Sequence, residues 1–242
     1  MKLISIFSLW LTAALAFAAE PPLKLTKDDV VVFLGGTDMV RAQRSGHLEA
    51  LLTAKFKDDL PKFRDMSWEG DTVFALGTEI DRWRSGGFRG IKGLGNLETQ
   101  LATVKATVVI VQLGKNEAFS GGEGVEAFIE GSDKLLGRLR GGNRQLIVLS
   151  PTPFEDANDP LYPDLRSRND DLRRYVNALR VAAEKHESLF VDLFTNAENS
   201  FTKNGLHVAP ENQAAFALHI ACLLYTSPSP RDRTRSRMPS SA

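Results

Sequence analysis

Residues 106–114 read ATVVIVQLG and residues 145–153 read QLIVLSPTP, and both stretches are almost uninterrupted runs of Val, Ile and Leu. Runs of this kind are typical of parallel strands that are buried on both faces of a sheet. Three further short runs complete a predicted set of five strands: VVVFLG (30–35), KFRDMSW (62–68) and SLFVDLF (188–194).

Helical patterns alternate with these runs. Apolar residues recur every three or four positions over residues 125–139, where two glycines at 141–142 end the pattern, and again over residues 172–183. Strands that alternate with helices imply right-handed crossover connections. We therefore predict an α/β fold, a three-layer α/β/α sandwich of the flavodoxin-like kind with a five-stranded parallel sheet.

The amino-terminal end has the pattern of an export signal. Met1-Lys2 forms a short positive region, residues 3–17 are apolar, and Ala16-Phe17-Ala18 gives the small-x-small pattern of a cleavage site. The alternative is an uncleaved anchor helix, although the apolar stretch is short for a membrane span. We predict a signal peptide over residues 1–18, no membrane span after its cleavage, and a periplasmic or extracellular location.

The carboxyl-terminal end differs from the rest of the chain. Residues 222–242 begin CLLYTSPSPRD and are rich in Ser, Pro and Arg, a composition that indicates a disordered basic tail. The same segment resembles the translation of a transposase sequencing adaptor. We therefore expect one domain over residues 19–221 that is truncated at its carboxyl end, an artefactual tail after it, and further domains in the untruncated chain.

Charge and cysteine content limit the classes of partner. Residues 19–221 hold 25 basic and 29 acidic residues, a net charge of about −4, which argues against nucleic acid as a partner. The only cysteine, Cys222, lies in the tail, and no pair of histidines has metal-ligand spacing. We predict no cofactor, no metal and no disulfide, so a single hydrophobic core must stabilise the domain.

Polar and glycine residues follow each predicted strand. In sheets of this kind, ligands bind beyond the carboxyl ends of the strands. The residues found there are Gly35-Gly36-Thr37-Asp38, Glu69-Gly70-Asp71, Gly114-Lys115-Asn116-Glu117, Pro151-Thr152-Pro153 and Asn204-Gly205-Leu206-His207.

This ordered set resembles the SGNH or GDSL hydrolase family over residues 29–220. The resemblance aligns Gly35-Gly36-Thr37 with the Gly-Asp-Ser motif that carries the nucleophile. It aligns Gly70 and Asn116 with the donors of the oxyanion hole, and His207 with the catalytic base. The α/β-hydrolase signature G-x-S-x-G does not occur in the sequence.

Two positions depart from the family's pattern. Thr37 stands where the family has Ser, and Asn204 stands where it has the Asp that supports the base. Threonine can act as a nucleophile beside a base, although its β-branch restricts χ1. Asp38 and Glu117 adjoin site positions and could supply the missing carboxylate. Thr37 could instead serve only as the N-cap of a helix that begins near residue 39.

The resemblance implies an exported ester hydrolase that removes small acyl groups from a carbohydrate or a similar polar substrate. Thr37 and His207 would form the catalytic pair, and the oxyanion donors would stabilise the charge on the tetrahedral intermediate. The alternative is a catalytically degenerate module that binds a ligand or glycan within a larger exported protein.

Overall fold

A five-stranded parallel sheet forms the centre of the molecule. The structure, a computed structural model, describes residues 23–74, 96–197 and 200–226, so the predicted signal peptide lies outside the described residues. The strands are β1 (Val30–Gly35), β2 (Lys62–Asp65), β3 (Val108–Gln112), β4 (Gln145–Leu149) and β5 (Leu189–Val191). Their order is β2-β1-β3-β4-β5, and every neighbouring pair is parallel.

This order confirms the predicted flavodoxin-like sandwich. The chain moves from β1 to one edge of the sheet and then returns to add β3, β4 and β5 on the other side of β1. The loops after β1 and β3 therefore diverge to opposite faces, and such a switch point is where ligands bind in open α/β sheets. Four strands are shorter than the predicted runs: β2 ends at Asp65, β3 spans Val108–Gln112, β4 ends at Leu149 and β5 spans Leu189–Val191.

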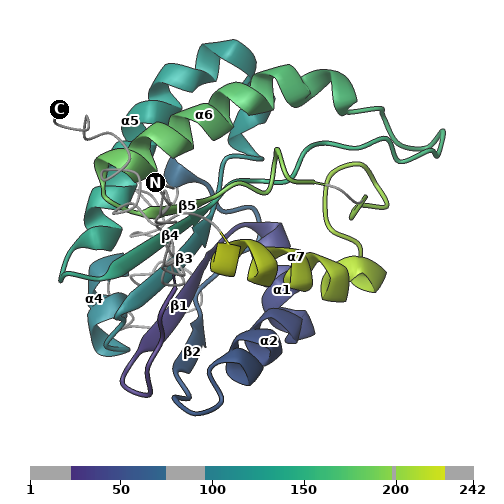
Figure 1. The fold of residues 1–242 in the computed structure, drawn as a ribbon. Coiled ribbons are helices and arrows are strands. Elements are labelled where there is room, and N and C mark those ends of the chain that lie inside the picture. Colours follow the sequence, from purple (N-terminus) through teal and green to yellow (C-terminus); the bar gives the residue numbers. More distant parts are fainter. Residues whose placement is uncertain (1–22, 75–95, 198–199, 227–242) are drawn as a thin grey trace, which may run out of the picture.

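Helices cover both faces of the sheet (Figure 1). One face carries α4 (Leu97–Thr103), α5 (Val125–Arg140) and α6 (Asn169–Lys185). The other carries α1 (Thr37–Ser45), α2 (His47–Lys55) and α7 (Gln213–Thr226). The predicted helices over 125–139 and 172–183 correspond to α5 and α6.

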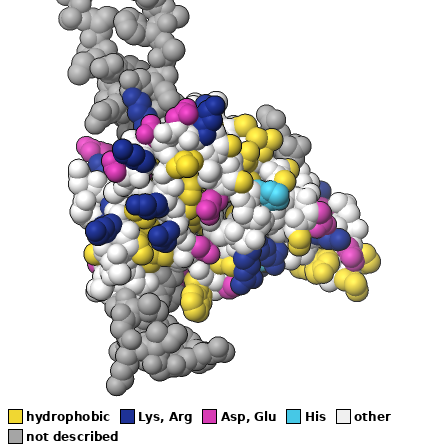
Figure 2. Space-filling view, turned by 90° about the horizontal axis from the view of Figure 1, so that it is seen from below, with side chains coloured by type: hydrophobic (Ala, Val, Ile, Leu, Met, Phe, Trp, Pro, Cys, Tyr) yellow, Lys and Arg dark blue, Asp and Glu magenta, His cyan; other side chains and the backbone are white. Residues whose placement is uncertain are grey.

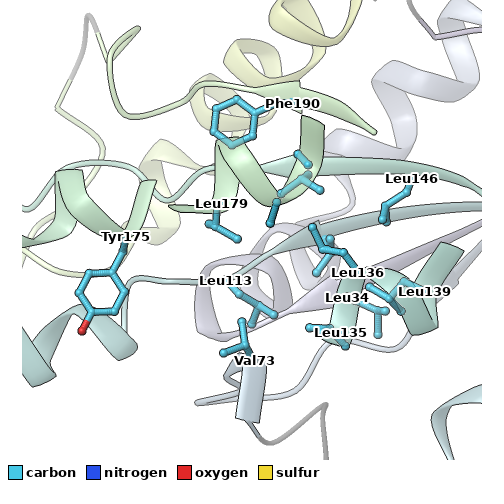
Figure 3. Close-up of a cluster of buried hydrophobic side chains, with 14 of the residues drawn as sticks. Leu34, Val73, Leu113, Leu135, Leu136, Leu139, Leu146, Tyr175, Leu179 and Phe190 are labelled. Atoms are coloured by element: carbon cyan, nitrogen blue, oxygen red, sulfur yellow. The ribbon is translucent and has the colours of Figure 1, made fainter. Parts of the chain in front are cut away.

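Alternate residues of each strand point to opposite faces and build two separate cores. Val32 and Leu34 of β1 join the cluster beneath α4, α5 and α6 (Figure 3). Val31 and Phe33 join the cluster beneath α1, α2 and α7. All four side chains are completely buried, which explains why the strand sequence is continuously apolar rather than alternating.

Helix α7 extends beyond the predicted end of the domain. It continues to Thr226, so residues 222–226 are helical and the expectation of a disordered tail is wrong for them. Leu224 is fully buried, and the ring of Tyr225 packs edge-on against Phe56 with the centroids 6.3 Å apart. Apolar residues of this segment pack on the core, which explains why the helix continues through them. Residues 227–242 lie outside the described part.

Gly35 lets β1 and β3 end side by side. Its φ of +145° lies in a region that side chains rarely adopt, and a Cβ built there would lie 2.5 Å from the carbonyl oxygen of Gln112. Gly35 and Gln112 are partners in the sheet register. The absence of a side chain at residue 35 therefore brings the two strand-end loops together, and these loops carry Thr37, Asp38, Lys115 and Asn116.

The surface has no strong charge of one sign on the face shown in Figure 2, where basic and acidic side chains lie interspersed. In the part of the chain that the structure describes, no helix is both long enough and apolar enough to cross a membrane.

Candidate active site

Thr37 lies at the start of α1, directly after β1. Gly36 is the N-cap residue of this helix and Thr37 is its first helical residue, so the interpretation of Thr37 as the N-cap is wrong. The hydroxyl oxygen of Thr37 accepts a hydrogen bond from the Gly70 N–H at 3.3 Å. The structure therefore brings together the candidate nucleophile and one candidate oxyanion donor from two different strand-end loops.

Gly70 has a conformational reason to be glycine. Its φ is +74°, the left-handed region, and a Cβ built there meets no atom within 4 Å in the described structure. The neighbouring residues therefore leave room for a side chain at position 70. The left-handed backbone directs the Gly70 N–H towards Thr37, and glycine adopts that conformation without steric cost.

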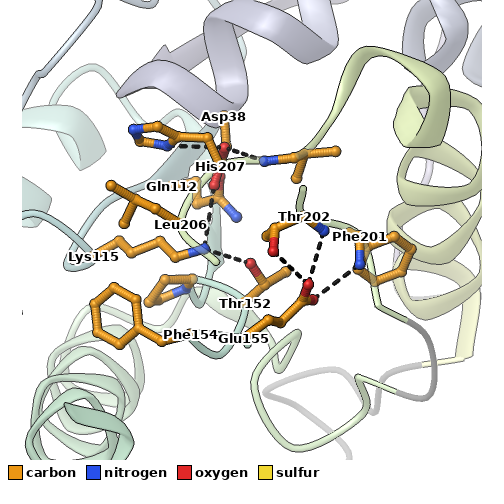
Figure 4. Close-up of polar contacts among 12 residues, drawn as sticks. Asp38, Gln112, Lys115, Thr152, Phe154, Glu155, Phe201, Thr202, Leu206 and His207 are labelled. Carbon is orange, nitrogen blue, oxygen red and sulfur yellow. Dashed lines mark hydrogen bonds and ion pairs between the residues drawn. The ribbon is translucent and has the colours of Figure 1, made fainter. Parts of the chain in front are cut away.

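His207 contacts a carboxylate that comes from α1. Nδ1 of His207 lies 3.3 Å from Oδ1 of Asp38, a charge contact outside good hydrogen-bond alignment (Figure 4). The Val208 N–H donates to the same oxygen at 3.0 Å. Asp38 was one of two carboxylates that could replace the family's acid, and the structure places it against the imidazole ring.

Asn204 occupies the family's acid position but has a different task. Its side-chain oxygen accepts hydrogen bonds from the backbone N–H groups of Leu206 at 3.1 Å and His207 at 2.9 Å. This arrangement closes the turn that presents His207, as Asn side chains commonly do. Asn204 therefore shapes the loop through backbone contacts, while the carboxylate contact to the ring comes from Asp38.

Glu117, the other carboxylate considered, braces the backbone. One of its oxygens accepts from the Val73 N–H at 2.8 Å and the other from the Gly114 N–H at 2.9 Å. Burial raises the pKa of Glu117, and these backbone donors partly oppose that effect. Both oxygens are therefore engaged in holding the loops after β2 and β3 together.

Asn116 lies on the loop after β3, beside the start of α1. Its side-chain nitrogen would lie 3.8 Å from a Cβ built at Gly36. Both residues line one small pocket, together with Thr37, Asp38 and His207. Asn116 therefore shares a cavity with the predicted catalytic pair, as an oxyanion donor must.

Lys115 is a buried cation in the same pocket, and the sequence-based reasoning did not select it. Its Nζ lies 3.6 Å from Oδ2 of Asp38 and donates to Oγ1 of Thr152 at 2.9 Å (Figure 4). Burial lowers the pKa of Lys115, and attraction to Asp38 and Glu155 opposes that effect. A charged residue directly after a buried strand, in LGKNE, was the signal that could have found it.

Asp38 remains ionised because its neighbours outweigh its burial. Only 7% of its surface is exposed, and burial alone would raise its pKa. The Lys115 ammonium, the contact with His207 and the Val208 N–H together hold the pKa of Asp38 below its ordinary value. The start of α1 adds the favourable field of a helix amino terminus.

Glu155, on the segment after β4, fixes the loop that carries His207. It accepts hydrogen bonds from the hydroxyl group of Thr202 and from the N–H groups of Phe201 and Thr202 (Figure 4). The hydroxyl group of Ser200 also donates to it. Burial would raise the pKa of Glu155, but these hydrogen bonds hold it below its usual range. Its own N–H donates to the Gly205 carbonyl at 3.0 Å.

The pocket that these residues line is small, about 30 Å³. Among the described residues, no group of three or more His, Cys, Asp or Glu side chains is placed to hold a metal ion. The arrangement offers a hydroxyl, an imidazole with a carboxylate, and amide donors, which are the groups that acyl transfer requires.

Comparison with known proteins identifies the fold. No family model matches the sequence, and no curated protein matches it either. A gut microbial diltiazem-metabolizing enzyme matches with a TM-score of 0.61 and 15% identity over 84% of this chain; the chain spans about half of that enzyme, 48%. An acetyl xylan esterase matches at 0.56 and 16%, covering 78% of this chain and 96% of its own.

A GDSL-like lipase from Bacteroides thetaiotaomicron matches with a TM-score of 0.56 and 11% identity, covering 88% of this chain and 90% of its own. Together these likenesses show that the chain has the fold of the SGNH and GDSL hydrolases. The fold expected from the strand-end motifs is thereby confirmed.

Proposed function

We propose that this protein is an ester hydrolase of the SGNH/GDSL type that removes short acyl groups from a polar substrate outside the cytoplasm. The observation that carries the proposal is the contact between Asp38 and His207, 3.3 Å from Oδ1 to Nδ1. This contact gives His207 a carboxylate partner, although Asn204 stands at the position where the SGNH/GDSL family has its acid. The export rests on the signal-like sequence of residues 1–18.

The reaction proceeds by acyl transfer to Thr37. Its hydroxyl oxygen attacks the ester carbonyl carbon while His207 takes the hydroxyl proton, and Asp38 stabilises the resulting imidazolium. The Gly70 N–H and the Asn116 amide stabilise the oxyanion, each at a typical ~3–4 kcal/mol. The intermediate collapses, the alkoxide leaves with the proton from His207, and a water activated by His207 then releases the acyl group from Thr37.

Two features support a short acyl group on a sugar-like substrate. The pocket is small, about 30 Å³, and is lined mostly by polar residues and glycines, which disfavours a long apolar acyl chain. Trp68, two residues before Gly70, is 59% exposed. Its backbone N–H donates to the Gly35 carbonyl at 2.9 Å, which places residue 68 at the ends of the strands. An exposed aromatic ring on a strand-end loop suits a ligand with apolar faces and hydroxyl groups.

The second candidate is a binding module that keeps the pocket without catalysis. One observation favours it: the Gly70 N–H donates to Thr37 at 3.3 Å, so this donor is engaged by the protein rather than aimed at a vacant oxyanion position. In a hydrolase, substrate binding must redirect that N–H. In a binding module the same contact would persist.

Initial rates on p-nitrophenyl acetate and p-nitrophenyl butyrate test the proposal. Thr37→Ala and His207→Ala are each expected to lower kcat by at least 10³-fold, as loss of a triad member does elsewhere. Thr37→Ser removes the branching methyl group and should raise kcat. Thr103→Ala, which alters an exposed hydroxyl bonded only to its own helix, is the matched control and should leave the rate unchanged.

Each outcome has a clear meaning. Turnover that disappears in Thr37→Ala and His207→Ala, while circular dichroism shows both variants folded, supports hydrolysis by this pair. Equal rates in the parent chain and both variants would refute the hydrolase and favour the binding module. Acetate turned over faster than butyrate is the result expected from the small pocket.

A further inference from the structure

Lys115 is buried where a free ammonium group would be unfavourable. Only 9% of its side chain is exposed, and it comes directly after β3 on the loop that also carries Asn116. Its Nζ lies 3.6 Å from Oδ2 of Asp38 and 2.9 Å from Oγ1 of Thr152. Burial of a charge is costly unless the charge is paired and hydrogen-bonded, and Lys115 meets both conditions through these two contacts.

We propose that Lys115 is a positioning residue of the active site, whose ammonium group holds Asp38 as an ionised carboxylate with Oδ1 turned towards His207. This inference rests on the proposed hydrolase function and extends its machinery by one residue. The proposed series of contacts runs from Thr37 to His207, then to Asp38 and then to Lys115. Only Thr37 and His207 touch the reacting atoms.

The two oxygens of Asp38 have separate partners, and this division carries the inference. Oδ2 faces Lys115, whereas Oδ1 faces His207 and accepts from the Val208 N–H. A carboxylate held at one oxygen by a cation and at the other by a backbone donor has little freedom to rotate. The Nδ1 side of the His207 ring therefore faces a carboxylate oxygen in a fixed place, 3.3 Å away, and in the proposed mechanism this leaves Nε2 to act as the base.

Lys115 has one other polar contact that could suggest a different role. A lysine can activate a hydroxyl nucleophile, and Thr152 lies within hydrogen-bond distance of Nζ. Thr152, however, is completely buried, with 0% of its surface exposed, so its hydroxyl is closed to substrate. Lys115 thus acts on the site through Asp38.

Several other charged groups surround this pair. Glu155 faces Lys115 from the segment after β4 and favours its charged form. Asp71 and Glu117 line the same pocket from the loops after β2 and β3. His207 faces Asp38 from the loop before α7. Within this group Lys115 makes the largest of the contributions that oppose the effect of burial on Asp38, so its removal must make the carboxyl easier to protonate.

The test replaces Lys115 by Met, which keeps the length of the chain and removes the charge. Lys134→Met is the matched control, because Nζ of Lys134 also lies 3.6 Å from a carboxylate, that of Glu130, but at the exposed surface of α5. The pH dependence of kcat/KM on p-nitrophenyl acetate is measured for both variants and the parent. In parallel, NMR follows the side-chain carboxyl carbon of Asp38 through an acid titration.

Lys115→Met is expected to move the acid limb of kcat/KM to higher pH by about one unit or more, because a cation beside a carboxyl lowers its pKa by about 1–3 units. It should lower kcat at least tenfold with KM changed less than twofold, and the Asp38 carboxyl should protonate at higher pH. Lys134→Met should leave all three quantities at the parent values.

An acid limb and an Asp38 titration that coincide with those of Lys134→Met would overturn the inference. Should Lys115→Met fail to fold, Lys115→Gln keeps a donor for Asp38 and Thr152 without the charge, and the same outcomes apply to it. The NMR titration does not depend on turnover. A parent chain without esterase activity would refute the proposed function, whereas an unchanged Asp38 titration would refute the role of Lys115.

Discussion

Replacement of Asp38 by Asn should destabilise the fold far more than the loss of a surface charge would. Asp38 and Lys115 are 7% and 9% exposed at their side chains, and Oδ2 and Nζ are 3.6 Å apart. At an effective dielectric constant of about 20, two unit charges at this distance attract by about 5 kcal/mol. Asp38→Asn removes one partner and leaves the Lys115 charge buried, a change that typically costs about 3–5 kcal/mol.

A double variant separates the free-energy cost of the unpaired Lys115 charge from the other effects of Asp38→Asn. Asp38→Asn combined with Lys115→Met removes both charges, and buried pairs replaced in this way are often neutral in stability. We expect the double variant to recover at least half of the lost free energy of unfolding. Lys134→Met, at an exposed pair of equal length, should change stability by no more than about 0.5 kcal/mol.

Urea denaturation followed by tryptophan fluorescence and circular dichroism gives the free energies of unfolding. A loss below about 1 kcal/mol in Asp38→Asn, or a double variant no more stable than the single one, would refute the reasoning. The sign of the pH dependence is a second check. The pKa of Asp38 in the folded chain lies below its ordinary 3.8, so its contribution is present above that value and is lost as the pH falls through the folded pKa. The deficit of Asp38→Asn should therefore shrink in acid.

Three other substitutions, with Gly46→Ala as a control for one of them, test separate parts of the site. Asn204→Asp should change kcat on p-nitrophenyl acetate less than threefold, because residue 204 contacts backbone N–H groups rather than the imidazole ring. Gly205→Ala should cost about 2–4 kcal/mol in urea denaturation, because strain at φ +74° adds to a Cβ placed 2.6 Å from the Glu155 carbonyl oxygen. Gly46→Ala, at φ +72° in open space, should cost only about 1 kcal/mol. Trp68→Ala should raise KM for an acetylated xylo-oligosaccharide about tenfold more than KM for p-nitrophenyl acetate.

Much of the fold could be predicted from local sequence pattern. The runs that became β1, β3 and β4 are continuous in Val, Ile and Leu because both faces of these strands are covered. The helical spacing of α5 and α6 likewise reflects one buried face. Every strand except β1 was predicted too long, because the end of a strand depends on loop contacts and not on the composition of the run.

The positions of the site loops also followed from the sequence, which left open whether Asp38 or Glu117 would contact His207. Thr37 and Asp38 are consecutive, which suggested that they would point apart, and in a helix consecutive side chains do diverge by about 100°. The site surrounds the start of α1, so Thr37 faces the Gly70 loop while Asp38 faces the His207 loop. A contact across 169 residues of chain has no local signature.

Placement of the acid on α1 has a physical advantage over placement at residue 204. At the start of α1 the carboxylate of Asp38 meets Lys115, the Val208 N–H and the helix amino terminus, three groups that favour negative charge. The amide of Asn204 instead closes its own loop without needing a counterion. As a result, the proposed nucleophile and the acid are carried by one rigid helix, and the loop of His207 supplies only the base. The geometry of that loop then depends on contacts it receives from outside: Asp38 at Val208, and Glu155 at residues 200–202. In the proposed mechanism, an acid supplied from α1 thus orients the base and anchors its loop through the same carboxylate.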